Sequence, residues 1–440
     1  MKRKVASAAL TVAMIMGSMM PTMPVMAENQ EGITIDFWHS MGGVNGEAMN
    51  YLVQKFNEEN EYGITVNAEY QGEYDDTINK LKSAQIGNMG ADLVQIYDIG
   101  TRFMIDSGWV VPMQELIDRA GYDVSQIEPN IAAYYTIDDQ LYSMPFNSST
   151  PLLYYNKDMF AAAGIEEVPT SLEGIAEIAD QLTNEGGAGE AISLGIYGWF
   201  FEQFLCKQGL QYVNNGNGRE GVAENVVFDE NGGALNILNE WKALYDAGYA
   251  PNVGRGGDSG LTDFSAGKSA ITLGSTASLK QILQDVNGKF EVGTAYFPSV
   301  TDADEGGVSI GGASLWALNN EDEAKQDATW KFVEFLVSPE SQAYWNAQTG
   351  YFPITTAAHE EQVFLDNIAQ YPQFQTAIDQ LHDSAPEYAG ALMSIFPEAR
   401  QTVESNIENM LNGSMTPEEA VAAMAESINA SLEDYNLLNN

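Results

Sequence analysis

Short apolar runs alternate with segments of helical periodicity over the first hundred residues. Three runs typical of strands occupy residues 33–37, 64–66 and 91–97. Between them, apolar side chains recur three or four positions apart at residues 49–56 and 78–81, as on one face of a helix. Strands that alternate with helices form βαβ units, so this region predicts a mainly parallel sheet with both faces covered.

The same alternation returns after residue 150 with different spacings. Strands are expected at residues 152–155, 192–197 and 270–273, and helices at 170–182 and 235–245. The first of these helices is expected to begin with a capping box of Thr170 and Glu173. Further strands are expected between residues 290 and 316. From Glu323 onward the chain is almost entirely helical, with helix starts at Ser338-Pro339 and Thr416-Pro417.

The length of 440 residues suits two domains, and no Pro/Ser-rich linker separates them. We therefore expect two α/β lobes joined by short crossovers near residues 145–151, 274–278 and 312–335. The expected N-terminal lobe comprises residues 28–146 and 276–325, and the expected C-terminal lobe comprises residues 147–275 and 326–440. Ligands of open α/β sheets bind at the carboxyl ends of strands, so two facing lobes predict a cleft between them.

The first 27 residues have the character of a signal peptide. Lys2, Arg3 and Lys4 precede an apolar stretch that is too short to span a bilayer, and a small-residue cleavage site ends at Ala27. The one cysteine, Cys206, lies far from that site, so no lipid-bearing cysteine is expected there. We expect an exported, periplasmic or extracellular protein without a lipid anchor.

The charge of the chain excludes one class of partner. There are 62 Asp and Glu residues against 19 Lys and Arg residues, a formal net charge of −43. Binding to nucleic acid depends on neutralising phosphates with basic residues, so nucleic acid is not an expected partner. The excess of acids is typical of a soluble surface.

Sequence signals for catalysis are weak. The three histidines, His39, His359 and His382, are widely spaced, and no HExxH motif or Cys/His cluster occurs. We therefore expect no metal, no cofactor and no Ser-His-Asp site. A secreted hydrolase is a disfavoured alternative, because no nucleophile motif accompanies the many acids.

Four polar residues, 147–150, lie between Pro145 and Pro151 at one expected crossover. Proline restricts the backbone, so the two prolines limit the freedom of the chain as it passes between lobes. We expect the hydroxyl groups of this run to face the cleft, while a hinge of a few residues moves.

Five motifs occur together in a specific order: FWHSMGG (37–43), ADLVQIYDIG (91–100), MPFNSSTPLLYYNKDMF (144–160), GGASLWAL (311–318) and QTGYFPIT (348–355). With them the chain resembles the extracellular solute-binding proteins, family 1, of ABC importers, and within these the members that bind glycerol-3-phosphate. The resemblance runs from about Ile33 to the C-terminal helices. It implies a type II periplasmic-binding-protein fold, in which two α/β lobes joined by hinge crossovers close on a ligand.

The resemblance also implies a phosphoglycerol site at these positions: Tyr74, Asp98, Ser149, Ser275, Gly312, Tyr351 and Arg400. Arg400 offers a planar fork of donors that suits two phosphate oxygens. The serine and tyrosine hydroxyls can donate to the same group, and Ser275 can also open a helix. Gly312 has no Cβ, so its backbone N–H can approach a ligand closely. An ionised Asp98 only accepts hydrogen bonds and suits glycerol hydroxyls.

Two departures from the family pattern leave the identity of the ligand open. Asp98 stands where the family more often has Glu, and the shorter side chain admits a larger polyol or a bridging water. Ser171 stands after Thr170, where the family often has a Trp that packs on the ligand. We expect Trp199 or Trp38 to supply the replacement aromatic face.

The resemblance implies a binding module without catalytic activity. It would capture glycerol-3-phosphate or a glycerophosphodiester and deliver it to the membrane subunits of an ABC permease, and would be a monomer when free. The alternative is a neutral sugar or oligosaccharide as ligand, since Asp98, Tyr74 and the tryptophans suit sugar hydroxyls equally well.

Overall fold

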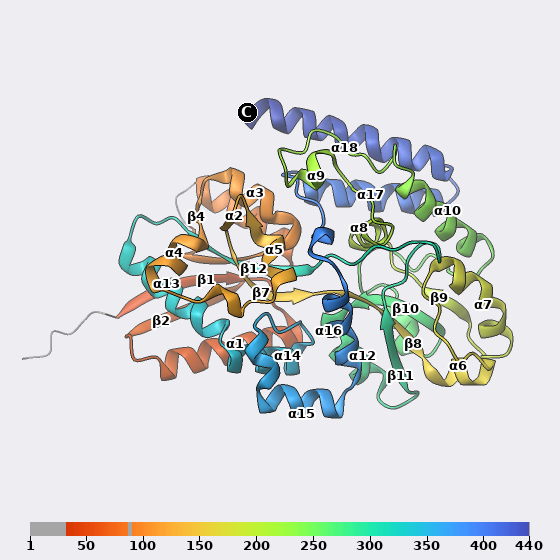
Figure 1. Ribbon diagram of the computed structural model, residues 1–440, viewed down its shortest axis with the longest axis horizontal. Coiled ribbons are helices and arrows are strands. Elements are labelled where there is room, and N and C mark those ends of the chain that lie inside the picture. The colour runs from red at the N-terminus through yellow and green to blue at the C-terminus, as the bar shows by residue number, and fades with distance from the viewer. Residues whose placement is uncertain (1–31, 87–89, 440) are drawn as a thin grey trace, which may run out of the picture.

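The computed structural model describes residues 32–86 and 90–439, except for the side chain of Ile86. The expected signal peptide, residues 1–27, lies outside the described residues. Two α/β lobes lie side by side, with the first sheet on the left of Figure 1 and the second on the right. The two-lobed α/β architecture expected from the sequence is confirmed.

The sheet of the first lobe has the strand order β2-β1-β3-β12-β4, with β7 also paired to β12. Its strands are β1 (Ile33–His39), β2 (Ile64–Tyr70), β3 (Leu93–Tyr97), β4 (Val110–Val111), β7 (Met144–Ser149) and β12 (Gly311–Leu318). The strands β2, β1 and β3 are parallel, as their alternation with helices predicted. By contrast, β12 is antiparallel to β3, β4 and β7. Strand β12, which comes from far along the chain, therefore joins β4 and β7 to the parallel strands of this sheet.

Helices cover both faces of the first sheet. They are α1 (Gly43–Glu59), α2 (Tyr74–Ile86), α3 (Thr101–Ser107), α4 (Met113–Ala120), α5 (Pro129–Tyr135), α13 (Glu323–Leu336) and α14 (Pro339–Thr349). Side chains alternate along a strand, and Ile35 and Phe37 of β1 are buried in one core cluster with residues of α1 and α13. Ile78 and Leu81 of α2 belong to the other cluster, on the opposite face.

The second sheet has the order β11-β8-β10-β9. Its strands are β8 (Pro151–Asn156), β9 (Glu190–Ser193), β10 (Ser269–Ser275) and β11 (Val292–Tyr296). Only β9 and β10 are parallel, because β8 runs antiparallel to both β10 and β11. The strand expected at residues 192–197 ends at Ser193.

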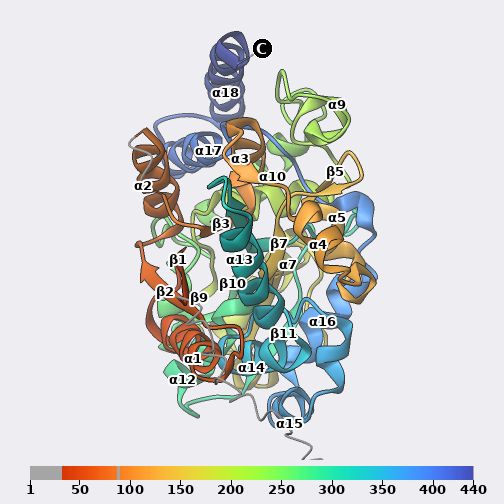
Figure 2. The same ribbon diagram turned by 90° about the vertical axis from the view of Figure 1, so that its left-hand side faces the viewer.

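The helices of the second lobe include the C-terminal pair. They are α6 (Lys157–Ala163), α7 (Leu172–Asn184), α8 (Gly198–Lys207), α9 (Asn214–Gly218), α10 (Gly233–Asp246), α11 (Leu261–Ser265), α12 (Leu279–Val286), α17 (Phe396–Leu411) and α18 (Pro417–Asn439). In both ribbon views α18 lies along the top of the molecule with α17 beneath it (Figures 1 and 2). Among the described residues, no helix is long and apolar enough to cross a membrane.

Short 3₁₀ segments and a small hairpin complete the fold. They are η1 (Asp98–Gly100), η2 (Val124–Gln126), η3 (Thr276–Ser278), η4 (Thr356–Glu360), η5 (Pro386–Tyr388), β5 (Thr136–Ile137) and β6 (Gln140–Leu141).

The first crossover between the lobes lies where the sequence predicted it. Strand β7 belongs to the first sheet, β8 belongs to the second, and only Thr150 separates them. The N–H of Thr150 donates to Oγ1 of Thr276 at 3.3 Å, and the N–H of Thr276 donates to the carbonyl of Thr150 at 2.9 Å. The crossover is therefore held against the segment that follows β10.

The lobe boundaries expected after residue 275 need correction. Residues 276–325 were expected in the N-terminal lobe, but β11 pairs with β8 of the second sheet. Helix α12 packs in the same core cluster as β8 and β11, so it also belongs to the second lobe. Residues 326–440 were expected in the C-terminal lobe, but α13 and α14 pack against β1 and α1 of the first lobe. The chain therefore crosses at residues 297–310, between β11 and β12, rather than near 274–278 or 312–335.

A third crossing runs from α14 to α17 through α15 (Gln362–Gln370) and α16 (Gln373–Asp383). Helix α16 contacts both lobes: Gln380 donates to the carbonyl of Pro151 at 2.6 Å, and the carbonyl of Leu381 accepts from Asn130 of α5 at 2.7 Å. Three crossings thus join the lobes.

Two helix starts expected from the sequence are confirmed. Ser338 caps α14 by accepting from the N–H of Ser341 at 3.3 Å. At α18, the N–H of Thr416 donates to Glu419 at 2.9 Å and the N–H of Glu419 donates to Thr416 Oγ1 at 3.2 Å. This reciprocal pair is a capping box.

Candidate ligand-binding cleft

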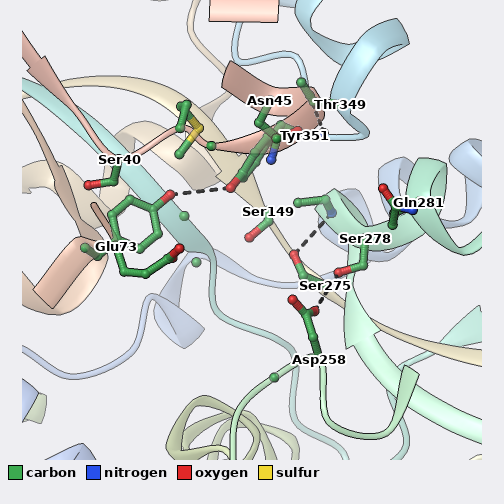
Figure 3. Close-up of a pocket in the computed structure, with 18 of the residues that line it drawn as sticks. Ser40, Asn45, Glu73, Ser149, Asp258, Ser275, Ser278, Gln281, Thr349 and Tyr351 are labelled. Atoms are coloured by element: carbon green, nitrogen blue, oxygen red, sulfur yellow. Dashed lines mark hydrogen bonds between the residues drawn. The ribbon is translucent and has the colours of Figure 1, made fainter. Parts of the chain in front are cut away.

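A cavity of about 740 Å³ lies between the two lobes. Its walls come from the carboxyl ends of strands β1, β2 and β3, from the crossovers, and from α8, the 257–262 loop, η3, α12 and α17. A volume of this size lies within the range of small-molecule sites. Figure 3 shows the side chains of Ser149, Ser275 and Tyr351 facing this cavity.

The structure brings every sequence-predicted site residue to this one cavity. The residues that line it are Tyr74, Asp98, Ser149, Trp199, Ser275, Gly312, Tyr351 and Arg400. They come from both lobes and from positions more than 300 residues apart. Their convergence supports the predicted site, while each contact with a ligand stays a prediction.

A network of hydrogen bonds holds the two tyrosines. The hydroxyl groups of Tyr74 and Tyr351 lie 3.4 Å apart, and Asn147 Nδ2 donates to the Tyr74 hydroxyl at 2.9 Å. Gln95 Nε2 in turn donates to Asn147 Oδ1 at 2.7 Å. Burial raises the pKa of both tyrosines, so their hydroxyl groups stay protonated and can donate to a ligand.

Gly312 is required by the strand pairing itself. Its φ is +91°, a left-handed conformation that side chains rarely adopt, and a Cβ there would collide with the carbonyl oxygen of Asn147. The register of β12 against β7 shifts between Ala313 and Ser314, just beyond this contact. The glycine therefore serves the backbone as well as the cavity that it lines.

Ser275 opens a helical segment, as the sequence predicted. Its Oγ accepts from the N–H of Ala277 at 3.2 Å, at the start of η3 and α12. Its carbonyl accepts from the hydroxyl of Tyr154 at 2.7 Å. These contacts fix the serine at the edge of the cavity (Figure 3).

Arg400 of α17 is buried between two carboxylates. Its Nε and Nη2 each donate to Glu202 of α8 at 2.8 Å, and Nη2 lies 3.5 Å from Asp98. The side chain of Arg400 is 8% exposed. One edge of the expected phosphate fork is thus taken by Glu202. Among the described residues, Nη1 of Arg400 has no hydrogen-bond partner, and Arg400 lines the cavity.

Burial and charge set the protonation of this cluster. Burial raises the pKa of Glu202 to about 7, with Arg400 opposing the shift. Burial likewise raises the pKa of Asp98. Burial by itself lowers the pKa of the Arg400 guanidinium, but the nearby carboxylates of Glu202 and Asp98 raise it by more. The pKa therefore lies above its ordinary value, and Arg400 stays charged.

Glu202 was not predicted as a site residue, although the sequence contains a signal for it. It is the single acid within the apolar run Trp199 to Cys206, where a charge needs a partner. Asp258 was also missed, because its glycine-rich loop, residues 254–260, has no spacing that marks a site. In the structure Asp258 lines the cavity and accepts from Ser278 at 3.3 Å (Figure 3).

The helix cap expected at Thr170 needs correction, because it is formed by Ser171, which stands where the family often has a Trp. Ser171 caps α7 by accepting from the N–H of Gly174 at 2.8 Å, in place of the expected Thr170, and it donates to Asp302 at 2.5 Å. Ser171 is fully buried and does not line the cavity. Of the two candidate replacements, Trp199 lines the cavity and Trp38 does not.

The described residues contain no group of three or more His, Cys, Asp or Glu side chains that could hold a metal ion.

Two lobes, three crossings and a polar cavity between them define the class of two-lobed solute-binding proteins. The chain belongs to the family of bacterial extracellular solute-binding proteins, whose pattern it matches over residues 51–376. The family resemblance predicted from the motifs is thereby confirmed. The protein is the substrate-binding component of an ABC importer.

Curated relatives share nearly the whole length of the chain. The sn-glycerol-3-phosphate-binding periplasmic protein UgpB of Escherichia coli K12 is 33% identical over 429 residues, covering 93% of this chain and 95% of the relative. UgpB of Salmonella typhimurium is 34% identical over 422 residues, covering 91% and 93%.

Solved structures share the fold. UgpB of Mycobacterium tuberculosis, in complex with glycerophosphocholine, superposes with a TM-score of 0.78 at 23% identity, covering 92% of this chain and 99% of that one. The GacH receptor of Streptomyces glaucescens, solved unliganded and with acarbose, superposes with a TM-score of 0.76 at 20% identity, covering 92% and 99%. The predicted two-lobed periplasmic-binding-protein fold is confirmed by these neighbours.

Proposed function

We propose that this protein captures glycerol-3-phosphate or a glycerophosphodiester in the cavity between its lobes and delivers it, chemically unchanged, to the permease subunits. The proposal depends mainly on one observation: the guanidinium of Arg400 is buried at the cavity, and its Nη1, which has no hydrogen-bond partner among the described residues, is free to bind a ligand. Ser149 and Ser275, which line the same cavity, add hydroxyl donors of the kind that a phosphate group needs. The names of the curated relatives agree with this ligand class.

The size of the cavity favours a glycerophosphodiester over glycerol-3-phosphate alone. A three-carbon phosphate leaves much of a 740 Å³ cavity unfilled. The wall beyond Ser275 carries further polar groups, Asp258, Ser278 and Gln281, which suit the second alcohol of a diester (Figure 3).

A neutral oligosaccharide is the second candidate, and the charge of the cavity wall supports it. Two cations, Lys280 and Arg400, line the cavity against four acids: Glu73, Asp98, Asp258 and Asp285. Carboxylates and the Trp199 ring suit sugar hydroxyls and sugar faces. Acarbose is the ligand of the GacH receptor, which shares this fold.

Isothermal titration calorimetry with glycerol-3-phosphate, glycerophosphocholine and maltose separates the candidates. We expect one phosphoglycerol ligand to bind with a stoichiometry of one and to be recovered unchanged. Arg400→Lys should weaken binding by tenfold or more, because lysine lacks the planar fork that holds both Glu202 and the ligand. The matched control is Arg119→Lys, a surface arginine near Asp327. Binding of maltose alone, or turnover of a ligand, would overturn the proposal.

We further propose that the protein is exported by cleavage after Ala27, carries no lipid and is a monomer when free. The one cysteine, Cys206, is buried within α8, which supports the absence of a lipid-bearing cysteine. Intact-mass measurement of the exported protein and light scattering on the purified protein test these points. A mass above that of residues 28–440, or a dimer mass, would contradict them.

A further inference from the structure

The charges around Arg400 do not balance before any ligand binds. Arg400 is the only cation that touches Glu202 or Asp98 among residues 32–86 and 90–439, so the ionised triad has a net charge of −1. Glu404 is a further acid near this triad. Its carboxylate accepts from the N–H of Gly198 at 2.9 Å, and it interacts electrostatically with Arg400. A phosphate that approaches Nη1 therefore enters a site that is already negative.

The structure gives the two carboxylates little freedom to leave. Glu202 is held by two parallel hydrogen bonds to Arg400, on a helix whose neighbouring side chains are buried. Asp98 is 5% exposed, and its backbone carbonyl accepts from the Tyr134 hydroxyl at 3.0 Å. Because charges interact strongly where water is excluded, an added anion raises the cost of keeping both carboxylates ionised.

The elements that pack against Glu202 and Asp98 bring further titratable groups close to both carboxylates. Around Glu202 lie Asp98, Tyr134, Tyr197, Cys206, Tyr212, Arg400 and Glu404. Around Asp98 lie Tyr74, Tyr97, Tyr134, Tyr135, Tyr197 and Arg400, with Asp75 behind Tyr97 and Arg219 behind Tyr134. Burial raises the pKa of the tyrosines and of Cys206, so these groups stay protonated, while burial also raises the pKa of the Asp98 and Glu202 carboxyl groups.

We infer that binding of an anionic ligand is coupled to the uptake of a proton by the Glu202–Asp98 pair. This coupling rests on the proposed phosphoglycerol function. In it, Glu202 is a positioning residue, which holds Arg400 and takes up a proton to adjust the charge of the site. Burial already raises the pKa of Glu202 to about 7 in the empty protein. A ligand anion raises it further, so the bound state holds more protons than the free state above that pH.

The sign of the pH dependence follows from this difference. Below about pH 6 the proton is present in both states, and affinity does not change with pH. Above about pH 7 binding must take up a proton, so affinity falls by up to about tenfold per pH unit. A glycerophosphodiester is the right probe, because a phosphomonoester titrates near pH 6 itself.

Calorimetric titration of the wild-type protein with glycerophosphocholine, at about pH 7.5 in two buffers of different ionisation enthalpy, counts the protons. We expect uptake of about half to one proton per ligand. Binding with no proton uptake would overturn the inference and leave the proposed function intact. Absence of binding by any phosphoglycerol ligand would overturn both.

Two variants locate the proton. Glu202→Gln should abolish most of the uptake and flatten the pH profile, even if it changes stability, because the count is made per ligand bound. Glu128→Gln is the matched control: Glu128 is also a buried carboxyl group with a raised pKa, but it lies beside His382, away from the cavity. Equal uptake in the Glu202→Gln and wild-type proteins would assign the proton elsewhere and overturn the role of Glu202.

Discussion

Gly198 lies directly against the side chain of Arg400. A Cβ at position 198 would collide with Arg400 Cγ and come within 3.3 Å of its Cα. The glycine begins α8, and Glu202 follows one helical turn later to receive the guanidinium. The close approach of α8 and α17 at this glycine therefore places the arginine at the cavity.

This contact predicts the effect of Gly198→Ala. The added methyl group must push the arginine stem aside, which should cost about 1–3 kcal/mol of unfolding free energy. The displaced guanidinium should lose its bidentate contact with Glu202, and binding of glycerophosphocholine should weaken by about tenfold or more. Calorimetry and urea unfolding measure the two effects.

The matched control is Gly221→Ala, at an exposed glycine where a Cβ would meet only ordinary contacts. It should leave affinity unchanged. Unaltered binding in Gly198→Ala would show that the position of Arg400 is not set by this contact.

Ser149→Ala should weaken ligand binding without lowering the melting temperature of the empty protein. Ser149 lines the cavity, and its hydroxyl has no hydrogen bond to another described residue, so its removal leaves no protein group unpaired. A lost hydrogen bond to a charged ligand group should reduce affinity by about tenfold. Ser148→Ala is the control, because the Ser148 hydroxyl is buried without a partner and does not line the cavity. Equal affinities for both variants would remove Ser149 from the site.

Salt should raise the association rate of an anionic ligand. The chain has a formal net charge of −43, which repels an anion at long range until counterions screen it. Between about 0.01 and 0.15 M salt, the rate for glycerol-3-phosphate should rise roughly two- to tenfold, as followed by tryptophan fluorescence in stopped flow. A neutral sugar, if it binds, should show almost no change. A rate that falls with salt would mean that the local field at the cavity is positive.

His39 should make stability depend on pH in the acid range. Burial lowers the pKa of His39 to about 4, whereas the unfolded residue titrates near its ordinary value of 6.5. Between these values the unfolded state binds more protons, so the contribution of His39 is complete above pH 6.5 and is lost as the pH falls towards 4.

His39→Gln removes this titration. The free energy of unfolding from urea curves should fall less steeply between about pH 6.5 and 4.5 in the variant, by at most about 3 kcal/mol. The N–H of Met41 donates to Nδ1 of His39 at 3.2 Å, and protonation of that nitrogen removes this hydrogen bond, which adds to the loss of stability at low pH. Parallel pH profiles for the variant and the wild type would contradict the expectation.

Local signals account for the parts of the fold that were predicted correctly. Helical periodicity, strand-length apolar runs and capping residues such as Thr416 and Glu419 act within a few residues, so the sequence shows them directly. The family resemblance supplied seven of the eight expected residues that line the cavity, and the eighth, Trp199, was one of two tryptophans considered for the aromatic face.

Long-range pairing accounts for the parts that were not predicted. Assignment of β11 to the second sheet depends on its hydrogen bonds to β8, 136 residues away at the Val292–Asn156 pair. Thr170 was expected to cap α7, but Ser171 caps it and is buried away from the cavity.

The sequence by itself determined the class of fold, the alternation of strands and helices, and which residue types could meet a phosphorylated solute. Only the tertiary structure decided that Glu202 holds Arg400, across 198 positions of chain, and that Asp98 and Glu404 lie nearby. The reason is physical: periodicity and caps report interactions within a turn or a strand, whereas the charge of a buried site depends on which side chains the packing of α8 against α17 brings together.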